Sequence, residues 1–198
     1  MIVLASASPR RQELLRNAGI AFTVQAADID ETPRAGEPAR ECAERLAREK
    51  ALAVWKTRPN DVVLGADTIV VIDDAILNKP VDAEDAVRML RMLAGREHRV
   101  ITGVCVVGGP LLANAARSGA SAENQVLVQV ESETTLVTMG AVSDEEIREY
   151  VTTGEPMDKA GAYAIQGRAS RWITRIEGDY ANVVGLPVAR VWRMLNNH

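Results

Sequence analysis

Ile2-Val3-Leu4-Ala5-Ser6-Ala7-Ser8-Pro9-Arg10-Arg11 opens the chain with an apolar run that changes at once into a polar turn. The apolar run predicts a short buried strand, and the residues from Ser8 onward predict a helix directly behind it. Ser8 is a favourable N-cap residue, because its side-chain oxygen can accept a free N–H of the first helical turn. Pro9 suits the first helical position, and Gly19 predicts the end of the helix.

Two arginines, Arg10 and Arg11, fall in the first turn of this predicted helix. The helix dipole disfavours cations at this end unless an anion binds there. The hydroxyls of Ser6 and Ser8, the free N–H groups and the two guanidinium groups form a donor set that suits a phosphate. The alternative is an ordinary strand–helix turn with solvated arginines, and this stretch alone does not decide between the two.

Length and composition limit the classes of protein that need to be considered. The 198 residues, 47% of them hydrophobic, suit one compact domain or two closely joined lobes. A net charge of −4 argues against general affinity for nucleic acid. The chain shows neither a secretory signal nor an apolar run of membrane-spanning length, so we expect a cytoplasmic protein with no membrane partner. Cys42 and Cys105 are then expected to be reduced thiols, and His98 is expected to lie on the surface.

The rest of the chain alternates between strand-like and helix-like segments. Strands are expected at 22–25, 62–72, 100–107, 126–139 and, as short pieces, near 161–165 and 172–177. Helices are expected at 38–56, 83–94, 143–154 and from 186 to about 195, with Asp82 and the pair Ser143 and Glu146 as N-terminal caps. The order predicts a single α/β domain over 1–198, with a mixed sheet and flanking helices. Small and polar residues at about 108–125 predict a hairpin loop or flexible insertion.

Two carboxylates are candidates for chemistry. Asp67 falls inside the apolar strand 62–72, where a charge is costly unless it is paired, hydrated or bound to metal. Gly65, two residues earlier, permits a bulge or the close approach of a ligand. Asp67 is therefore either a metal ligand or general base, or a side chain that satisfies nearby backbone groups. Glu31, in the acidic loop 28–37, is the second candidate, although such loops are usually only solvated.

Two lysines and a glutamine complete the candidates. Lys50 and Lys79 would ordinarily be surface residues, but Pro80 fixes the backbone behind Lys79 and can aim its side chain. Small residues and two glycines in the segment 155–167 permit close approach to a ligand. The amide of Gln166 offers both a donor and an acceptor, which suits the edge of a nucleobase. The alternative for this segment is a tightly packed turn.

Taken together and in order, these segments resemble the Maf family of nucleotide pyrophosphatases. The matching stretches are Ser6-Ala7-Ser8-Pro9-Arg10-Arg11, Arg48-Glu49-Lys50-Ala51, Gly65-Ala66-Asp67-Thr68, Lys79-Pro80, Thr102-Gly103, Asp158-Lys159-Ala160-Gly161-Ala162-Tyr163, Ile165-Gln166-Gly167 and Asn182-Val183-Val184-Gly185-Leu186-Pro187. Each stretch alone is weak, but the ordered set is highly specific. The resemblance implies a twisted mixed sheet in two lobes around a central cleft, similar to the inosine-triphosphate pyrophosphatases. It also implies a homodimer and a divalent cation, Mg²⁺ or Mn²⁺.

The resemblance further implies hydrolysis of a nucleoside triphosphate to the monophosphate and pyrophosphate. Arg10, Thr68 and Gln166 match the dTTP/UTP type of the family, which differs at these positions from the 7-methyl-GTP type. Modified pyrimidine nucleotides such as 5-methyl-UTP and pseudo-UTP are further candidate substrates. Their removal would prevent incorporation of modified nucleotides and influence cell division.

Roles for the other candidates follow from the same resemblance and from their chemistry. Asp67 is expected to be the proton acceptor and, with Glu31, to hold the metal. Arg11, Lys50 and Lys79 are expected to bind the triphosphate, with hydrogen bonds from Ser6 and Ser8. The alternative is a nucleotide-binding regulator of cell division and septum formation with little turnover, which would need Arg11 and Lys79 but not two metal-competent carboxylates.

Overall fold

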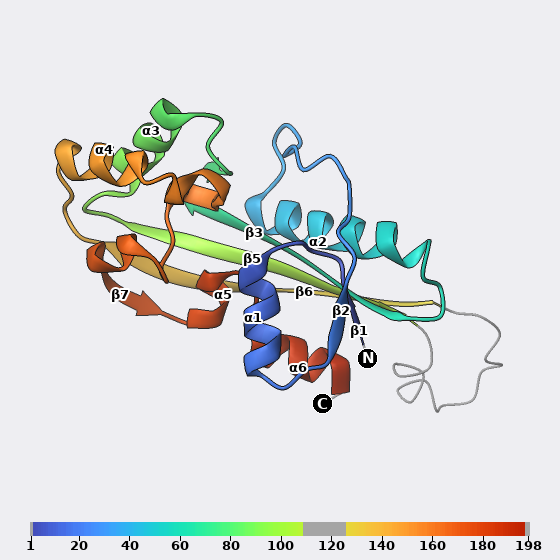
Figure 1. Ribbon diagram of the computed structural model, residues 1–198. Coiled ribbons are helices and arrows are strands. Elements are labelled where there is room, and N and C mark those ends of the chain that lie inside the picture. The colour runs from blue at the N-terminus through green and yellow to red at the C-terminus, as the bar shows by residue number, and fades with distance from the viewer. Residues whose placement is uncertain (1, 109–125, 197–198) are drawn as a thin grey trace. The chain divides into compact units, whose positions relative to one another are not determined.

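The computed structural model describes residues 2–108 and 126–196, so almost all of the insertion predicted at 108–125 lies outside the described residues (Figure 1). The strands are β1 (Ile2–Leu4), β2 (Phe22–Val24), β3 (Val62–Ile72), β4 (Ala75–Leu77), β5 (Glu97–Gly108), β6 (Leu127–Met139) and β7 (Ile173–Glu177). The α-helices are α1 (Pro9–Asn17), α2 (Ala39–Trp55), α3 (Ala83–Leu93), α4 (Asp144–Thr152), α5 (Tyr180–Val184) and α6 (Val188–Asn196). Short 3-10 helices are η2 (Glu155–Asp158), η3 (Ala160–Ala162) and η4 (Arg168–Trp172).

The strands form one mixed sheet. Its order is β2-β1-β3-β5-β6-β7, and β4 pairs with β3 off this path. β1 is parallel to both β2 and β3, whereas β4 is antiparallel to β3 and β7 is antiparallel to β6. The predicted class, α/β with a mixed sheet and flanking helices, is confirmed.

The chain divides into two compact units. The first comprises Met1–Asp67, Thr102–Glu133 and Gly185–His198, and the second comprises Thr68–Ile101 and Thr134–Val184. The boundaries fall inside β3, β5 and β6, so each of these strands contributes residues to both units. That 1–198 acts as one functional domain stays a prediction.

The first unit has an apolar layer on each face of its part of the sheet. Ile2 and Leu4 of β1 belong to one cluster, which includes Leu15 of α1 and Val191 of α6. Val3 alternates to the other cluster, which holds the α2 residues Ala47, Ala51 and Val54. Because successive side chains along a strand point to opposite faces, the unbroken apolar run at the start of the chain matches a strand covered on both sides.

Helix α2 packs closely on the sheet because a strand residue beneath it lacks a side chain. A Cβ atom added at Gly65 would lie 2.8 Å from the backbone nitrogen of Ala51, and closer still to the carbonyl oxygen of Ala47. Real Cβ atoms do not come this close to other atoms, so only glycine fits. The close approach predicted at Gly65 is therefore that of the α2 backbone, and not that of a ligand.

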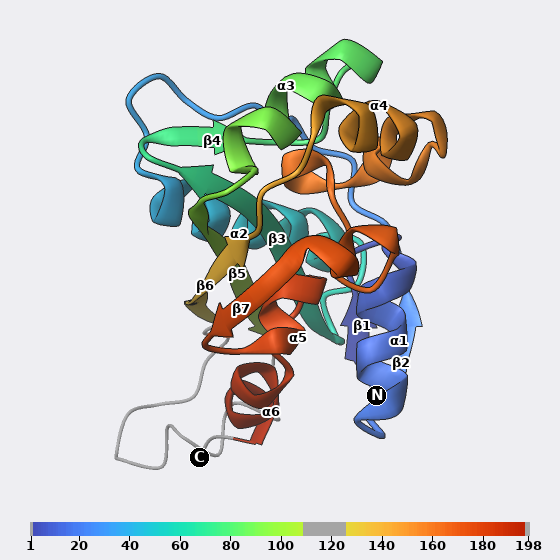
Figure 2. The same cartoon turned by 90° about the vertical axis from the view of Figure 1, so that its left-hand side faces the viewer.

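The second unit places α3 beside α4 (Figure 2). Arg91 of α3 donates to both carboxylate oxygens of Asp144 at the start of α4, at 2.8 and 2.6 Å. The predicted caps are confirmed. The Asp82 side chain accepts from the backbone N–H of Asp85, and Ser143 and Glu146 form a capping box.

Two sequence-based expectations for this unit are wrong. The strand expected near 161–165 is a 3-10 turn followed by irregular backbone. His98 is buried, not on the surface: the residue is 2% exposed, and its Nε2 lies 2.8 Å from the hydroxyl of Tyr163. Burial lowers the pKa of His98 to about 4. In the described ranges, no helix combines the length and apolarity needed to cross a membrane.

We predict that Gly65→Ala destabilises the protein by about 1–3 kcal/mol, the usual cost of overpacking a core. The new methyl group would press on the α2 backbone at Ala47 and Ala51. Urea unfolding measures the effect. The matched control is Gly140→Ala, whose methyl group would come no nearer than 3.3 Å to any neighbour. Equal stabilities for the two variants would contradict the packing role of Gly65.

Candidate active site

The turn between β1 and α1 is organised by the hydroxyl of Ser6. Its Oγ accepts from the backbone N–H of Ser8 at 3.2 Å and from Nη1 of Arg11 at 3.1 Å. Ser8 occupies the N-cap position of α1, but its side chain makes no capping hydrogen bond, so that part of the prediction is wrong. Ser6, not Ser8, is the hydroxyl that orders the turn.

Arg11 is a buried cation at the start of α1. Its Nε donates to the carbonyl oxygen of Gly185 at 2.8 Å, and the residue is only 9% exposed. Burial lowers the pKa of Arg11, and the nearby charge of Arg10 adds to this effect, whereas the carboxylates of Asp67 and Glu31 oppose it. The two carboxylates are therefore close enough to Arg11 to share one electrostatic site with it.

Asp67, Lys50 and Glu31 form a chain of ion pairs. The Nζ atom of Lys50 lies 2.6 Å from Oδ1 of Asp67 and 2.8 Å from Oε1 of Glu31. Lys50 and Asp67 are each 7% exposed, whereas the Glu31 side chain is 46% exposed. A buried charge requires such pairing. Asp67 lies inside an apolar strand, and Lys50 is the partner that offsets its charge. Lys50, which would ordinarily be a surface residue, is buried.

The loop that carries Glu31 is held by Arg45, a residue of α2 that sequence reasoning missed. Arg45 donates from Nε and Nη2 to the two carboxylate oxygens of Glu37, at 2.6 and 2.8 Å. Its Nη2 also donates to the carbonyl oxygen of Thr32 at 3.2 Å, directly beside Glu31. Helix α2 thus presents Lys50 to the carboxylates and fixes the loop with Arg45. In the sequence, only the acidic residues before and after Arg45 indicated that this arginine could form an ion pair.

Thr68, Lys79 and Gln166 belong to the second unit. Thr68 follows Asp67 on β3, and Lys79 is an exposed residue just beyond β4. Gln166 is exposed in the turn that follows η3. The segments of Lys79 and Gln166 are linked, because the carbonyl oxygen of Asn78 accepts from the backbone N–H of Gly161 at 3.2 Å.

The structure therefore brings several predicted residues together within the first unit: Ser6, Ser8, Arg10, Arg11, Glu31, Lys50 and Asp67. That Thr68, Lys79 and Gln166 complete the same site stays a prediction. Among the described residues, no three His, Cys, Asp or Glu side chains are grouped as a ready-made metal site. The possible metal ligands that do come together are the carboxylates of Glu31 and Asp67, which both pair with Lys50.

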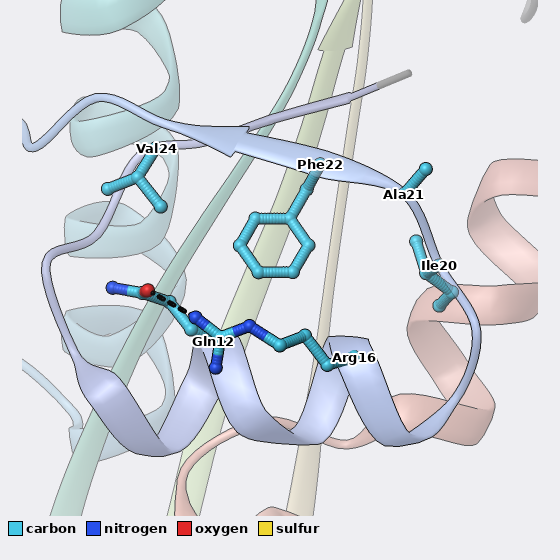
Figure 3. A pocket seen from close by; sticks show the side chains of 6 residues that line it. All are labelled: Gln12, Arg16, Ile20, Ala21, Phe22 and Val24. Carbon is cyan, nitrogen blue, oxygen red and sulfur yellow. Dashed lines mark hydrogen bonds between the residues drawn. The ribbon is translucent and has the colours of Figure 1, made fainter.

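A separate hollow of about 430 Å³ lies between α1 and β2, lined by Gln12, Arg16, Ile20, Ala21, Phe22 and Val24 (Figure 3). The guanidinium carbon of Arg16 lies 5.7 Å from the centre of the Phe22 ring, and Nη2 of Arg16 donates to Gln12 at 2.9 Å. These contacts fill part of the hollow with the protein's own groups. None of the predicted site residues lines it.

The fold and this site define an α/β protein with a buried arginine, a serine turn and two carboxylates, a set suited to phosphate chemistry. A family model described as Maf-like protein matches residues 1–198. The dTTP/UTP pyrophosphatase of Koribacter versatilis is 56% identical over 98% of this chain and 92% of its own length. Those of Symbiobacterium thermophilum and Anaeromyxobacter dehalogenans are 49% and 50% identical over the same fractions. The chain belongs to the Maf family.

The ion pair that holds the Glu31 loop predicts an acid-dependent loss of stability. The hydrogen bonds from Arg45 lower the pKa of Glu37 from 4.5 to about 2. Because the pKa is lower in the folded state, the pair's stabilisation is complete above pH 4.5 and is lost as the pH falls towards about 2. Urea unfolding of wild type and Glu37→Gln should show a stability gap that narrows through this window. A gap that stays constant would contradict the assignment.

Proposed function

We propose that the chain is a nucleoside triphosphate pyrophosphatase that hydrolyses dTTP and UTP to the nucleoside monophosphate and pyrophosphate. The observation that carries the proposal is the meeting of Asp67 and Glu31 on Lys50, close to Arg11. The names of the relatives support the choice of substrate, since these proteins are 56% and 49% identical to this chain over 98% of its length. The proposal treats 1–198 as one functional domain.

In the proposed reaction, a water molecule attacks the α-phosphorus of the nucleotide. A new P–O bond forms, the bond from the α-phosphorus to the oxygen that bridges to the β-phosphorus breaks, and pyrophosphate leaves with that oxygen. Asp67 accepts the proton of the water. Arg11, Lys50 and Lys79 offset the negative charge of the triphosphate, and Ser6 and Ser8 donate hydrogen bonds to it. Positioning and electrostatics supply the catalysis, as is usual for phosphoryl transfer.

A divalent cation, Mg²⁺ or Mn²⁺, is part of the proposal, and Glu31 and Asp67 would hold it. Mg²⁺ in proteins commonly takes only one or two carboxylates, together with water and substrate phosphates. Two carboxylates that converge within 2.8 Å of one ammonium group fit this donor set, even without a third protein ligand. When bound, the cation would offset charge on the phosphate oxygens and the leaving group.

Three residues are proposed to select the base: Arg10, Thr68 and Gln166. Thymine and uracil present an N3–H donor between two carbonyl acceptors. The neutral amide of Gln166 can complement a donor and an acceptor, whereas an ionised carboxylate can only accept. A site that reads such groups rejects a base that would leave them unpaired. We propose that the same residues also recognise the bases of 5-methyl-UTP and pseudo-UTP.

The setting of this activity is also a proposal. Nucleoside triphosphates are consumed in nucleic-acid synthesis, so we place the enzyme in the cytoplasm, where it would remove modified nucleotides and influence cell division. A homodimer is proposed from the family resemblance. The net charge of −4 and the short apolar runs of the sequence argue against nucleic-acid and membrane partners. A regulator of septum formation that only binds nucleotide is the rival function. Release of pyrophosphate from dTTP with added Mg²⁺ or Mn²⁺ distinguishes the enzyme from this rival.

We predict that Asp67→Asn lowers kcat for dTTP by about 10²–10⁴-fold, the usual contribution of a positioned general base. Asparagine keeps the shape of aspartate but cannot accept the proton. The assay is pyrophosphate release, with thermal unfolding of each variant alongside it. Asp61→Asn is the matched control, because Asp61 lies just ahead of β3 and pairs with Arg58 in a half-exposed contact. Near wild-type turnover of Asp67→Asn would rule out its role as base.

Gln166→Glu should reduce the preference for dTTP over GTP by about tenfold or more, because the carboxylate loses the amide's donor. Values of kcat/KM for the two nucleotides measure the preference. Gln25→Glu is the control, since Gln25 donates to Thr57 in the first unit. An unchanged preference in Gln166→Glu would show that this residue does not select the base.

A further inference from the structure

The proposed base-reading residue, Gln166, lies at the tip of a tight turn. The backbone N–H of Gly167 donates to the carbonyl oxygen of Ala164 at 3.0 Å, and the Gln166 side chain is exposed. An exposed side chain is not held by packing, so the position of this amide depends on the backbone on either side of it. What fixes that backbone therefore matters for recognition of the base.

Tyr150 fixes the chain ahead of Gln166. This residue of α4 is 1% exposed, and its ring packs edge-on against Trp172 with the ring centres 5.1 Å apart. Its hydroxyl oxygen accepts from the backbone N–H of Ala164 at 3.2 Å and donates to Oε1 of Glu155 at 2.8 Å. A rigid, buried ring thus holds one end of the turn.

Glu155 fixes the chain behind Gln166. Both of its carboxylate oxygens lie within hydrogen-bond distance of the backbone N–H of Arg168, at 3.0 and 3.2 Å. A Cβ atom added at Gly167 would lie 2.8 Å from Oε2 of Glu155, and closer still to Oε1. Because Gly167 has no side chain, the Glu155 carboxylate fits against it.

The contacts of Tyr150 and Glu155 are connected, because Tyr150 donates to the same carboxylate oxygen of Glu155 that accepts from the backbone N–H of Arg168. The backbone N–H groups on both sides of Gln166, at Ala164 and Arg168, end on this connected pair. An ionised carboxylate only accepts hydrogen bonds, and it here receives donors from a side chain and from the main chain. Loss of either member would release one end of the turn.

We propose that Tyr150 and Glu155 are positioning residues that set the selectivity for the pyrimidine base by fixing the turn of Gln166. The inference rests on the proposed function, in which Gln166 reads the base. Neither residue touches the reacting phosphates in this scheme, so their loss acts on binding and selectivity and not on the chemical step.

Tyr150→Phe tests the inference, because it keeps the buried ring and removes only the hydroxyl. We expect KM for dTTP to rise and the ratio of kcat/KM for dTTP over GTP to fall by about tenfold, as for loss of one buried hydrogen bond, with kcat for dTTP nearly unchanged. Tyr163→Phe is the matched control. Tyr163 is also buried in the second unit, but its hydroxyl contacts His98 and not the main chain beside Gln166. It should lose stability and keep the ratio.

Gly167→Ala provides an independent variant should Tyr150→Phe fail to fold, since its methyl group would displace the Glu155 carboxylate and leave Tyr150 in place. The double variant Gln166→Ala/Tyr150→Phe should show the same ratio as Gln166→Ala alone, because Tyr150 acts through Gln166. If Gln166→Ala lowers the ratio while Tyr150→Phe and Gly167→Ala keep it, the positioning role is wrong and the proposed function stands. If Gln166→Ala itself keeps the ratio, Gln166 does not read the base and the positioning role is wrong with it, whereas pyrophosphate release from dTTP still tests the proposed activity.

Discussion

The ammonium group of Lys50 lies 2.6 Å from the Asp67 carboxylate and 2.8 Å from the Glu31 carboxylate, and the proposed chemistry depends on this contact. Two carboxylates beside one another repel, and burial of Asp67 in an apolar strand adds a large desolvation cost. Lys50 offsets both effects. Lys50 thereby keeps the two acidic groups together, as the proposed binding of a metal ion and a triphosphate requires.

Helix α2 and the residues around it hold these three side chains in place. Gly65 lets the backbone of α2 lie directly against β3, which brings the helix residue Lys50 to the strand residue Asp67. The same helix holds the Glu31 loop through Arg45 and its two hydrogen bonds to Glu37. One helix therefore supplies the cation and fixes one of its two partners. In the second unit, Tyr150 and Glu155 hold the turn of Gln166 in a comparable way.

Local sequence patterns predicted local structure well. The opening strand and helix, the Asp82 cap and the capping box at Ser143 follow from neighbouring residues, and all are confirmed. The membership of the Maf family, inferred from an ordered set of short stretches, is confirmed too. Three side chains whose roles depend on distant partners were not predicted. His98 stands between arginines that indicated the surface, and the roles of Arg45 and Glu155 require contacts that no local pattern records.

In the proposed reaction, water attacks the α-phosphorus of the nucleotide. Hydrolysis of dTTP in water enriched in oxygen-18, with Mg²⁺ or Mn²⁺ present, tests it most directly. We expect mass spectrometry to find the label in the nucleoside monophosphate and none in the pyrophosphate. Label in pyrophosphate, or diphosphate and phosphate as products, would contradict it.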